Sequence, residues 1–430
     1  MKIRDIALLA AVSVLATGCT GLQKIDSEHV IDIAEIGIPD ETQPPTQPPP
    51  EPTSAHFLAV GDNLVHSCVY NTAAQHSPDG VDYDFHYCYE HVADKVAAAD
   101  LAFVNQETII CNGKYDVSGT NLNFNSPVEL GEDMIDVGFD IFNMANNHVL
   151  DKGSEGMEFT LDYWDEQMAE HSNVVVMGAY RNEEDMLNYR MTEVNDITVG
   201  FLGYTEHTNG YHLPENSDMV IVYTDEEELI QKQISELSEQ VDCVVVSMHW
   251  GVEDSHVVTD EVRELAQKLV NWGADVVIGT GSHTLESMEY LTREDGSQGF
   301  VFYSLGNFIS GQTDNFNMIG GMGEFEICKS AEGEITIEDV TLTPVITHYE
   351  SGMTNVRTYP YYLYTDELVE THNVPYAPGG SSKRWNWDVI NGIIHENVPE
   401  EFLLLTESPE ETSETEEISQ EDSDTSESED

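Results

Sequence analysis

Residues able to bind a metal ion or move a proton occur in six short clusters, and each cluster directly follows a short apolar run. In chain order the clusters are Gly61-Asp62-Asn63-Leu64-Val65-His66, Asn105-Gln106-Glu107, Asn146-Asn147-His148 with Asp151 and Gly153, His249-Trp250-Gly251 with Glu253, Gly281-Ser282-His283-Thr284, and Gly306-Asn307-Phe308. Two carboxylates, an Asn amide and several imidazoles form a mixed oxygen and nitrogen ligand set, which suits Mn, Zn, Fe or Mg rather than thiophilic metals. The clusters therefore predict a divalent-metal site.

Each of these residues also has an explanation that involves no metal. Asp62 and Asn147 would stabilise a turn through their side chains, Glu107 would lie on the surface, and a single histidine would be hydrogen-bonded inside the core. The repetition of the pattern after several apolar runs favours a shared site. No GxSxG elbow, Walker loop or GxGxxG follows a strand, so the sequence gives no support to a serine hydrolase, a P-loop protein or a dinucleotide-binding protein.

The elements that must position these clusters alternate between strands and helices. Near-continuous apolar runs typical of strands buried on both faces occur at 56–60, 101–104, 141–145, 174–178, 198–203, 243–248, 275–279 and 300–305. Apolar residues at helical spacing predict helices over 230–241 and 262–270, the second capped by Gly273. This alternation predicts an α/β domain with much parallel sheet, in which ligands bind where strands end.

After Gly311 the pattern changes. Residues 324–330 and 335–347 alternate as strands, with a glycine-containing turn at 331–333, and predict an antiparallel hairpin that extends a sheet. We expect the domain to cover 55–350 and an aromatic-rich, irregular extension to cover 351–400. The cysteines beyond Cys19 have no CxxC spacing, so neither a zinc knuckle nor a dense disulfide framework is indicated.

Charge excludes one class of partner. The chain carries 81 acidic residues against 16 Lys and Arg, a formal charge of −65, so we expect no binding to nucleic acid phosphates. Counting from the sequence, residues 51–400 hold 61 acidic and 13 basic residues, about −48. We expect such a surface to repel anionic polymers unless cations intervene.

The two ends of the chain have distinct compositions. Residues 1–19 resemble a lipoprotein signal peptide, because two basic residues precede a short apolar run that closes on Leu15-Ala16-Thr17-Gly18-Cys19. We expect lipidation at Cys19, a proline-rich spacer over 20–54 and a disordered acidic tail over 401–430. These features predict an extracytoplasmic protein held at the cell membrane by a lipid anchor.

Six motifs, GDNLVH, VNQE, ANNHVLDKG, MHWGVE, GSHTLES and YSLGNF, resemble in order and spacing those of the bacterial capsule-synthesis CapA family, also called the poly-γ-glutamate biosynthesis family. The domain of that family resembles the calcineurin-type metallophosphoesterase fold. The resemblance covers roughly 56–310. It implies a sandwich of two β-sheets flanked by helices, with a divalent-metal centre between the strand ends.

The resemblance also assigns roles to residues. It implies that the metal ligands are Asp62, Glu107, Asn147, His249 and His283, and that His148 donates a proton to the leaving oxygen. Further candidates in the same clusters are His66, Asn105, Asp151, Glu253 and Asn307. The chain departs from the family at Gly281, where members often carry histidine, so we expect one firmly held ion and a second, weakly held one.

The function implied by the resemblance is capsule (poly-γ-glutamate) biosynthesis at the cell envelope. If the protein is an enzyme, the natural reaction is metal-dependent hydrolysis of a phosphoester, and hydrolysis of a γ-glutamyl amide would use the same Lewis-acid chemistry. The alternative is a non-catalytic assembly or export factor that lies beside a membrane-embedded capsule synthase. Sequence does not separate these functions.

Overall fold

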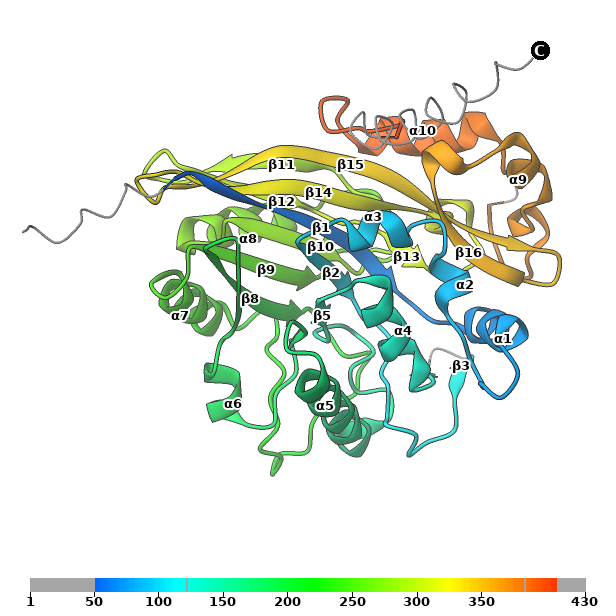
Figure 1. Cartoon of the computed structure of the whole chain (residues 1–430), viewed down its shortest axis with the longest axis horizontal. Helices are drawn as coiled ribbons and strands as arrows, with labels where there is room; N and C mark the ends of the chain where they lie inside the picture. The colour runs from blue at the N-terminus through cyan, green and yellow to red at the C-terminus, as the bar shows by residue number, and fades with distance from the viewer. Residues whose placement is uncertain (1–50, 121–122, 383, 408–430) are drawn as a thin grey trace, which may run out of the picture. The chain divides into compact units, whose positions relative to one another are not determined.

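The computed structural model describes residues 51–120, 123–382 and 384–407, which belong to one compact unit (Figure 1). Two large β-sheets form this unit, and helices lie against them. All eight strands predicted from apolar runs are present. The predicted α/β class and the predicted sandwich of two sheets flanked by helices are confirmed.

The first sheet combines a parallel half with an antiparallel half. Its parallel half contains β1 (Thr53–Asn63), β2 (Leu101–Asn105), β5 (Ile141–Asn143) and β6 (Val175–Met177). On the other side of β1 lie the antiparallel strands β14 (Ile319–Lys329), β15 (Ile335–Glu350) and β16 (Thr354–Pro360), while β13 (Asn307–Ile309) pairs with the end of β1. The predicted hairpin after Gly311 is therefore confirmed as β14 and β15.

The second sheet has a parallel centre with an antiparallel strand at each edge. Its order is β11 (Met288–Thr292), β12 (Gln298–Phe302), β10 (Val276–Thr280), β9 (Cys243–His249), β8 (Ile197–Thr205) and β7 (Arg190–Val194). A small two-stranded ribbon, β3 (Ser118–Thr120) and β4 (Asn123–Asn125), lies apart from both sheets. The carboxyl ends of the parallel strands in both sheets carry the polar clusters of the sequence.

The core lies between the sheets and beneath the helices. Phe57 of the first sheet lies 6.5 Å from Phe201 of the second, measured between ring centroids. Helices α7 (Glu227–Ser238) and α8 (Asp260–Trp272) cover the outer face of the second sheet through one apolar cluster. Gly273 ends α8 with a positive φ of 122°, as the predicted glycine cap requires.

Helices on the side of the first sheet are mostly short. They are α1 (Ser67–His76), α2 (His86–Tyr89), α3 (Ala93–Ala97), α4 (Glu129–Val137) and the long α5 (Gly153–Glu170), with α6 (Glu183–Leu187) preceding β7. Trp164 of α5 packs on Phe142 of β5 at 4.5 Å between ring centroids, which anchors α5 beside the parallel strands. The loop between β5 and α5 carries Asn146, Asn147 and His148, so this packing also fixes part of the polar edge.

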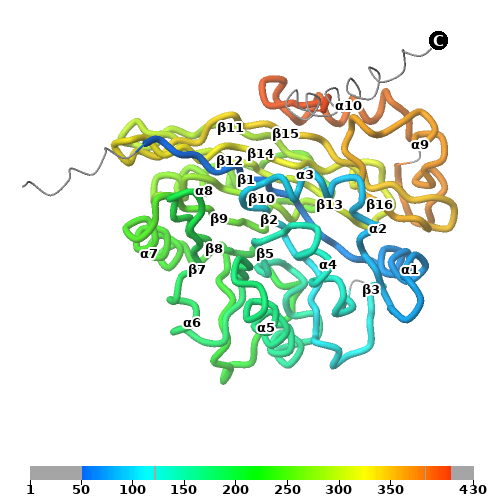
Figure 2. Tube along the Cα trace, viewed as in Figure 1, coloured from blue at the N-terminus to red at the C-terminus, as the bar shows by residue number. Residues whose placement is uncertain are grey.

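The segment 351–400, expected to be irregular, contains regular elements. Besides β16 it forms α9 (Asp366–Thr371) and α10 (Trp387–Asn397), joined by 3-10 turns. Figure 2 follows this orange and red part of the chain from β16 to α10. The Asn373 amide donates to the Tyr349 carbonyl of β15 at 2.9 Å, so the segment is attached to the first sheet. Elements this short do not produce a recognisable hydrophobic period.

No helix in the described part of the chain is long and apolar enough to cross a membrane. The predicted signal peptide with Cys19, most of the predicted spacer and residues 408–430 of the predicted tail lie outside the described residues. Residues 401–407, expected to be part of the disordered tail, are instead attached to the first sheet, because the Leu342 amide of β15 donates to the Phe402 carbonyl at 2.6 Å and the Leu404 amide donates to the Leu342 carbonyl at 2.9 Å. The five cysteines within the described ranges, Cys68, Cys88, Cys111, Cys243 and Cys328, are free thiols.

Candidate metal centre

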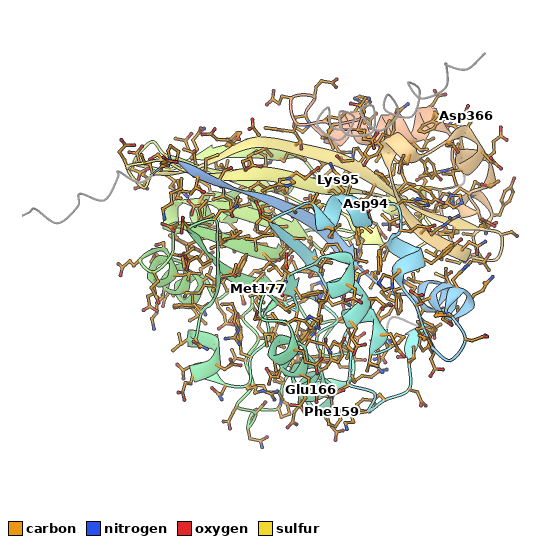
Figure 3. All side chains as sticks on the ribbon, viewed as in Figure 1. Asp94, Lys95, Phe159, Glu166, Met177 and Asp366 are labelled. Carbon is orange, nitrogen blue, oxygen red and sulfur yellow. The ribbon has the colours of Figure 1, made fainter. Side chains whose placement is uncertain are left out.

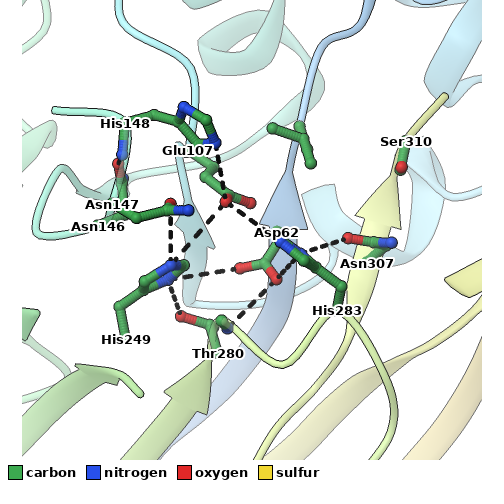
Figure 4. Close-up of polar contacts among 12 residues, drawn as sticks. Asp62, Glu107, Asn146, Asn147, His148, His249, Thr280, His283, Asn307 and Ser310 are labelled. Atoms are coloured by element: carbon green, nitrogen blue, oxygen red, sulfur yellow. Dashed lines mark hydrogen bonds and ion pairs between the residues drawn. The ribbon is translucent and has the colours of Figure 1, made fainter. Parts of the chain in front are cut away.

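The predicted ligands meet where strands of the two sheets end (Figure 4). Asp62 lies near the end of β1, Glu107 lies two residues beyond β2, and Asn147 follows β5. From the second sheet come His249, the last residue of β9, and His283, three residues beyond β10. All five residues are at most 4% exposed.

The first of these strand ends depends on a close backbone approach. A Cβ atom at Gly61 would lie 1.8 Å from the Gly306 carbonyl oxygen, so no other residue fits there without a shift. The Asp62 amide donates to the same carbonyl at 2.8 Å, and the β1–β2 register shifts between Val60 and Asp62. Gly61 thus lets β1 bend against the Gly306 loop and directs Asp62 into the site.

Asp62, Glu107 and His283 form the tightest group. Their ligand atoms lie within 4.8 Å of one another. His283 Nδ1 is 3.0 Å from Asp62 Oδ2, and His283 Nε2 is 3.7 Å from Glu107 Oε1. Two carboxylates and one imidazole at this spacing are a ligand set for a divalent cation.

Glu107 supplies the observation that tests whether a cation fits. Its side chain is fully buried, and neither carboxylate oxygen has a hydrogen-bond partner among the described residues. Burial, followed by the charge of Asp62, raises the pKa of Glu107 well above its usual value. A buried carboxylate without partners is strongly unfavourable, whereas a bound divalent ion would satisfy both oxygens. The residues present therefore fit a metal ion.

His283 carries the complementary charge in the protein without metal. Burial alone would favour its neutral form, but Glu107 and Asp62 together raise its pKa to about 10. Asp62 responds in the opposite direction: burial would raise its pKa, yet the hydrogen bond and charge of His283 hold it below the usual value. Because His283 must lose its proton to ligate, metal binding should release a proton here.

Asn147 and His249 form the other half of the site. His249 Nε2 lies 3.1 Å from Asn147 Oδ1 and 3.9 Å from Glu107 Oε1, while its Nδ1 lies 3.0 Å from Thr280 Oγ1. Burial lowers the pKa of His249 to about 3, so this imidazole is neutral and able to ligate. Glu107 faces both halves, as a bridging ligand must.

Gly281 contributes no ligand, and its backbone resists a side chain. Its φ is +102°, and a Cβ atom there would lie 3.0 Å from both the amide nitrogen and the carbonyl oxygen of Trp250. A histidine at this position would therefore strain the backbone before it reached a metal. For this reason the metal content of a Gly281→His variant would reflect the backbone strain as well as the added imidazole.

His148 lies beside the metal-ligating group with its ring held in place. His148 Nδ1 is 2.9 Å from Asp151 Oδ2, and His148 Nε2 is 3.9 Å from Glu107 Oε1. The Phe124 amide donates to the same Asp151 oxygen at 2.7 Å, and the Phe124 ring meets the His148 ring edge to face at 4.7 Å. Nδ1 is thus engaged, and Nε2 is the nitrogen directed to the site.

The remaining candidates from the sequence differ in their positions. Asn105 Nδ2 donates to Asp62 Oδ1 at 2.7 Å, and Asn307 Oδ1 lies 3.2 Å from His283 Nδ1, so both hold ligands in place. His66 lies outside the tight group, and Glu253 is exposed, although its charge acts on Glu107 and His283.

Sequence reasoning missed three residues that contact or border the ligands. Thr280 contacts His249, Asn209 Oδ1 accepts from Asn147 Nδ2 at 3.5 Å, and His207 lowers the pKa of His249 further. His207 and Asn209 lie in the loop after β8, whose apolar run was identified as a strand. Because ligands bind where strands end, their position directly after this predicted strand could have identified them as candidates from the sequence.

These features define the class of protein: an α/β sandwich of two sheets with a candidate divalent-metal centre at the strand ends. The family model described as bacterial capsule synthesis protein PGA_cap matches residues 56–312. The chain belongs to this family, which confirms the family identified from the six motifs.

Relatives in two Bacillus species carry corresponding names. The chain is 28% identical over 300 residues to PGA biosynthesis protein CapA of Bacillus subtilis (strain 168), covering 68% of this chain and 73% of that protein. It is 28% identical over 239 residues to capsule biosynthesis protein CapA of Bacillus anthracis, covering 54% of this chain and 55% of that protein. The second match thus spans about half of the relative's length.

Two of the solved structures that are similar to this chain are nucleotidases. The NAD nucleotidase NadN of Haemophilus influenzae has 15% identity and a TM-score of 0.43, covering 86% of this chain and 61% of that chain. A putative 5'-nucleotidase of Staphylococcus aureus has 16% identity and a TM-score of 0.43, covering 68% of this chain and 54% of that chain.

Proposed function

We propose that this protein is a divalent-metal-dependent phosphoester hydrolase that acts in the biosynthesis of a capsule polymer outside the cytoplasm. The observation that carries the proposal is Glu107, a fully buried carboxylate whose two oxygens have no hydrogen-bond partner in the described chain. A buried carboxyl in this state is ionised only when a cation lies beside it. Membership of the capsule synthesis family supplies the biological setting.

The residues have separate tasks in the proposed reaction. Asp62, Glu107 and His283 would hold one ion, and Asn147 and His249 would share a second, weaker one with Glu107. When bound, the metal supplies Lewis-acid chemistry, which polarises a phosphoryl oxygen and makes water a better nucleophile at neutral pH. His148, oriented by Asp151, would donate a proton from Nε2 to the leaving oxygen.

Elemental analysis of the purified full chain tests the metal centre. The wild type should retain about one divalent ion per chain after dialysis and take up a second only at high free metal. Glu107→Gln, which keeps the shape but removes the charge, should lose the firm ion. The control Glu264→Gln, an exposed acid on α8, should keep it. A Glu107→Gln protein that still holds its ion, or a wild type that binds none under any loading condition, would refute the centre.

A substrate screen tests the reaction. Metal-loaded protein should hydrolyse phosphomonoesters or phosphodiesters, and γ-glutamyl peptides serve as the competing substrate class. Hydrolysis of the peptides alone would replace the phosphoester assignment by an amide hydrolase with the same centre.

The structure offers one observation in favour of a non-catalytic assembly factor. Gly281 lacks the imidazole often found in the family, and its positive φ and the nearby Trp250 backbone would strain any side chain placed there. Firm metal binding without turnover of either substrate class would support this function, in which the ion holds the strand-end loops together beside a membrane-embedded capsule synthase.

The cellular location is part of the proposal. We propose that a lipid on Cys19 and the proline-rich spacer hold the domain at the outer face of the membrane; both lie outside the described residues. In a bacterial host the full chain should fractionate with membranes, and Cys19→Ser should remove that association. Release of a wild-type chain that is processed at another residue would contradict the anchor.

A further inference from the structure

His66 stands between the metal centre and helix α1 in a tightly packed position. It lies three residues beyond the end of β1 and directly precedes Ser67, the first residue of α1. A Cβ atom at Gly311 would lie 2.6 Å from the Cβ atom of His66, so the Gly311 segment packs closely on its side chain. On another side the Phe124 ring meets the His66 ring edge to face at 5.1 Å. These contacts restrict the imidazole to one orientation.

The hydrogen bonds of this imidazole determine which nitrogen carries the proton. His66 Nδ1 lies 3.1 Å from both the Leu64 carbonyl oxygen and the Gly311 amide nitrogen. The Leu64 carbonyl already accepts from the His66 amide at 2.9 Å, whereas the Gly311 amide has no other acceptor in the described chain. Gly311 N–H therefore donates to Nδ1. In the neutral ring the proton must then be on Nε2.

Nε2 of His66 is left without a partner. It makes no hydrogen bond or ion pair with any described residue, and the side chain is only partly buried. Burial lowers the pKa of His66 to about 4, and the imidazoles of His283 and His148 act in the same direction, so the ring is neutral and lies near both. A fixed, neutral N–H donor with no protein acceptor is thus available at the edge of the metal centre.

Phe124 connects this donor to the proton-donating histidine. The His66 ring and the His148 ring both contact the Phe124 ring edge to face, at 5.1 and 4.7 Å between centroids. The Phe124 amide is itself bound to Asp151, which orients His148. The relative positions of the two imidazoles are therefore set by one side chain, as a site that holds a substrate in a fixed pose requires.

We propose that His66 binds substrate by donating its Nε2–H to a non-bridging phosphoryl oxygen, while His148 serves the leaving oxygen. The inference rests on the proposed phosphoester function. A competing role for His66 is that of a metal ligand that replaces the missing side chain at position 281. Against that role, His66 makes no ion pair with Asp62 or Glu107, whereas His249 and His283 each lie within 3.9 Å of both carboxylates.

Binding of inorganic phosphate to the Mn²⁺-loaded full chain tests the proposal. His66→Phe keeps an aromatic ring against Phe124 but removes the donor, and should weaken phosphate binding about tenfold, the loss expected for one hydrogen bond to a charged group. His66→Gln reaches about as far as Nε2 and carries N–H donors, so it should restore most of the affinity. The control His395→Phe, an exposed histidine on α10, should bind as the wild type does.

Two further measurements separate the outcomes. The Mn²⁺ content of His66→Phe should equal that of the wild type, and with a hydrolysed phosphoester KM should rise more than kcat falls. A His66→Phe protein that binds phosphate as tightly as the wild type overturns the inference and leaves the proposed function intact. Loss of Mn²⁺ from the His66→Phe variant also overturns the inference, because it would show that His66 is a metal ligand. Failure of the wild type to bind phosphate at all would remove both the inference and the phosphoester function.

Discussion

The charge of Asp151 acts on His148 through one short contact. Asp151 Oδ2 lies 2.9 Å from His148 Nδ1 and also accepts from the Phe124 amide. A carboxylate in this position accepts from Nδ1–H and holds the ring so that Nε2, the nitrogen that a general acid would use, faces the site. Asp151→Asn keeps the shape and loses the charge, so turnover of an alkyl phosphoester should fall by on the order of 10²-fold.

The leaving group distinguishes this role from a structural one. A p-nitrophenyl ester needs little protonation of its leaving oxygen, so Asp151→Asn should affect its hydrolysis much less. Glu155→Gln, an exposed residue in the first turn of the following helix α5, is the control. Equal losses with both esters would show that Asp151 supports the fold of the loop rather than the proton transfer.

A second residue outside the ligand set, Glu286, should make the stability of the protein depend on pH. Glu286, in the loop after β10, is 1% exposed, and its Oε1 has no hydrogen-bond partner in the described chain. Burial raises its pKa from 4.5 to about 7, against the opposing charge of Arg263. A carboxyl whose folded pKa is raised favours folding fully below its unfolded pKa, and this contribution disappears as pH rises through the folded value.

The exchange Glu286→Gln should therefore stabilise the protein above pH 7 and have little effect near pH 4.5. The expected gain in the free energy of unfolding at pH 8 is about 1–3 kcal/mol. Urea denaturation of both proteins across pH 4.5–8 measures it, with the exposed Glu264→Gln as control. A constant difference at every pH would mean that the carboxyl charge is not the cause.

For single residues, the sequence predicted the residue types of the candidate site but not its strained backbone geometry. Asp62, Glu107, His249 and His283 were identifiable because each follows an apolar run. The positive φ of Gly281 and the proximity of the Trp250 backbone arise from the packing of two loops far apart in the sequence. No local pattern records such a contact.

Among the elements, α3 is joined to the first sheet by a buried ion pair. Lys95 of α3 is labelled in Figure 3. Its Nζ lies 3.1 Å from Oε2 of Glu324 on β14. His56 of β1 contacts the same oxygen through Nε2 at 3.5 Å. Burial would raise the pKa of Glu324, but His56 and Lys95 hold it below the usual value. Lys95→Met would leave this buried carboxylate short of a partner.

The expected cost of Lys95→Met is about 3–5 kcal/mol in the free energy of unfolding. The double variant Lys95→Met with Glu324→Met should recover most of that loss, since apolar side chains of similar volume often replace a buried pair without penalty. Urea denaturation of the two variants and the wild type completes the test. If the double variant were as unstable as the single one, packing rather than charge would be the cause.

The parallel strands of both sheets were predictable, including the edge strand β6, whereas the antiparallel edge strands of the second sheet were not. All eight apolar runs are strands because burial on both faces makes almost every residue apolar. Strands β7 and β11 lie at the edges of the second sheet, where partial exposure breaks the apolar run. The division of the strands into two sheets depends on pairings between distant segments and came only from the family resemblance.

For the molecule as a whole, net charge is the dominant property. Of the twelve Lys and Arg residues in the described chain, nine form ion pairs with Asp or Glu. Few cationic side chains are thus left to contact an anionic polymer such as polyglutamate. The formal charge of −65 adds a long-range repulsion that is strongest at low ionic strength.

Free polyglutamate should therefore bind weakly at low salt, and added salt or divalent cations should increase its binding rather than decrease it. Screening weakens the repulsion, and divalent ions are able to bridge carboxylates of the polymer and of the protein. Fluorescence anisotropy with labelled polyglutamate, titrated with NaCl and separately with Mg²⁺, measures both effects, while labelled polylysine is the control and should show the opposite salt dependence. Tight polyglutamate binding at low salt without divalent ions, weakening as salt rises, would reveal attraction by a local group of unpaired cations and would refute the dominance of net charge.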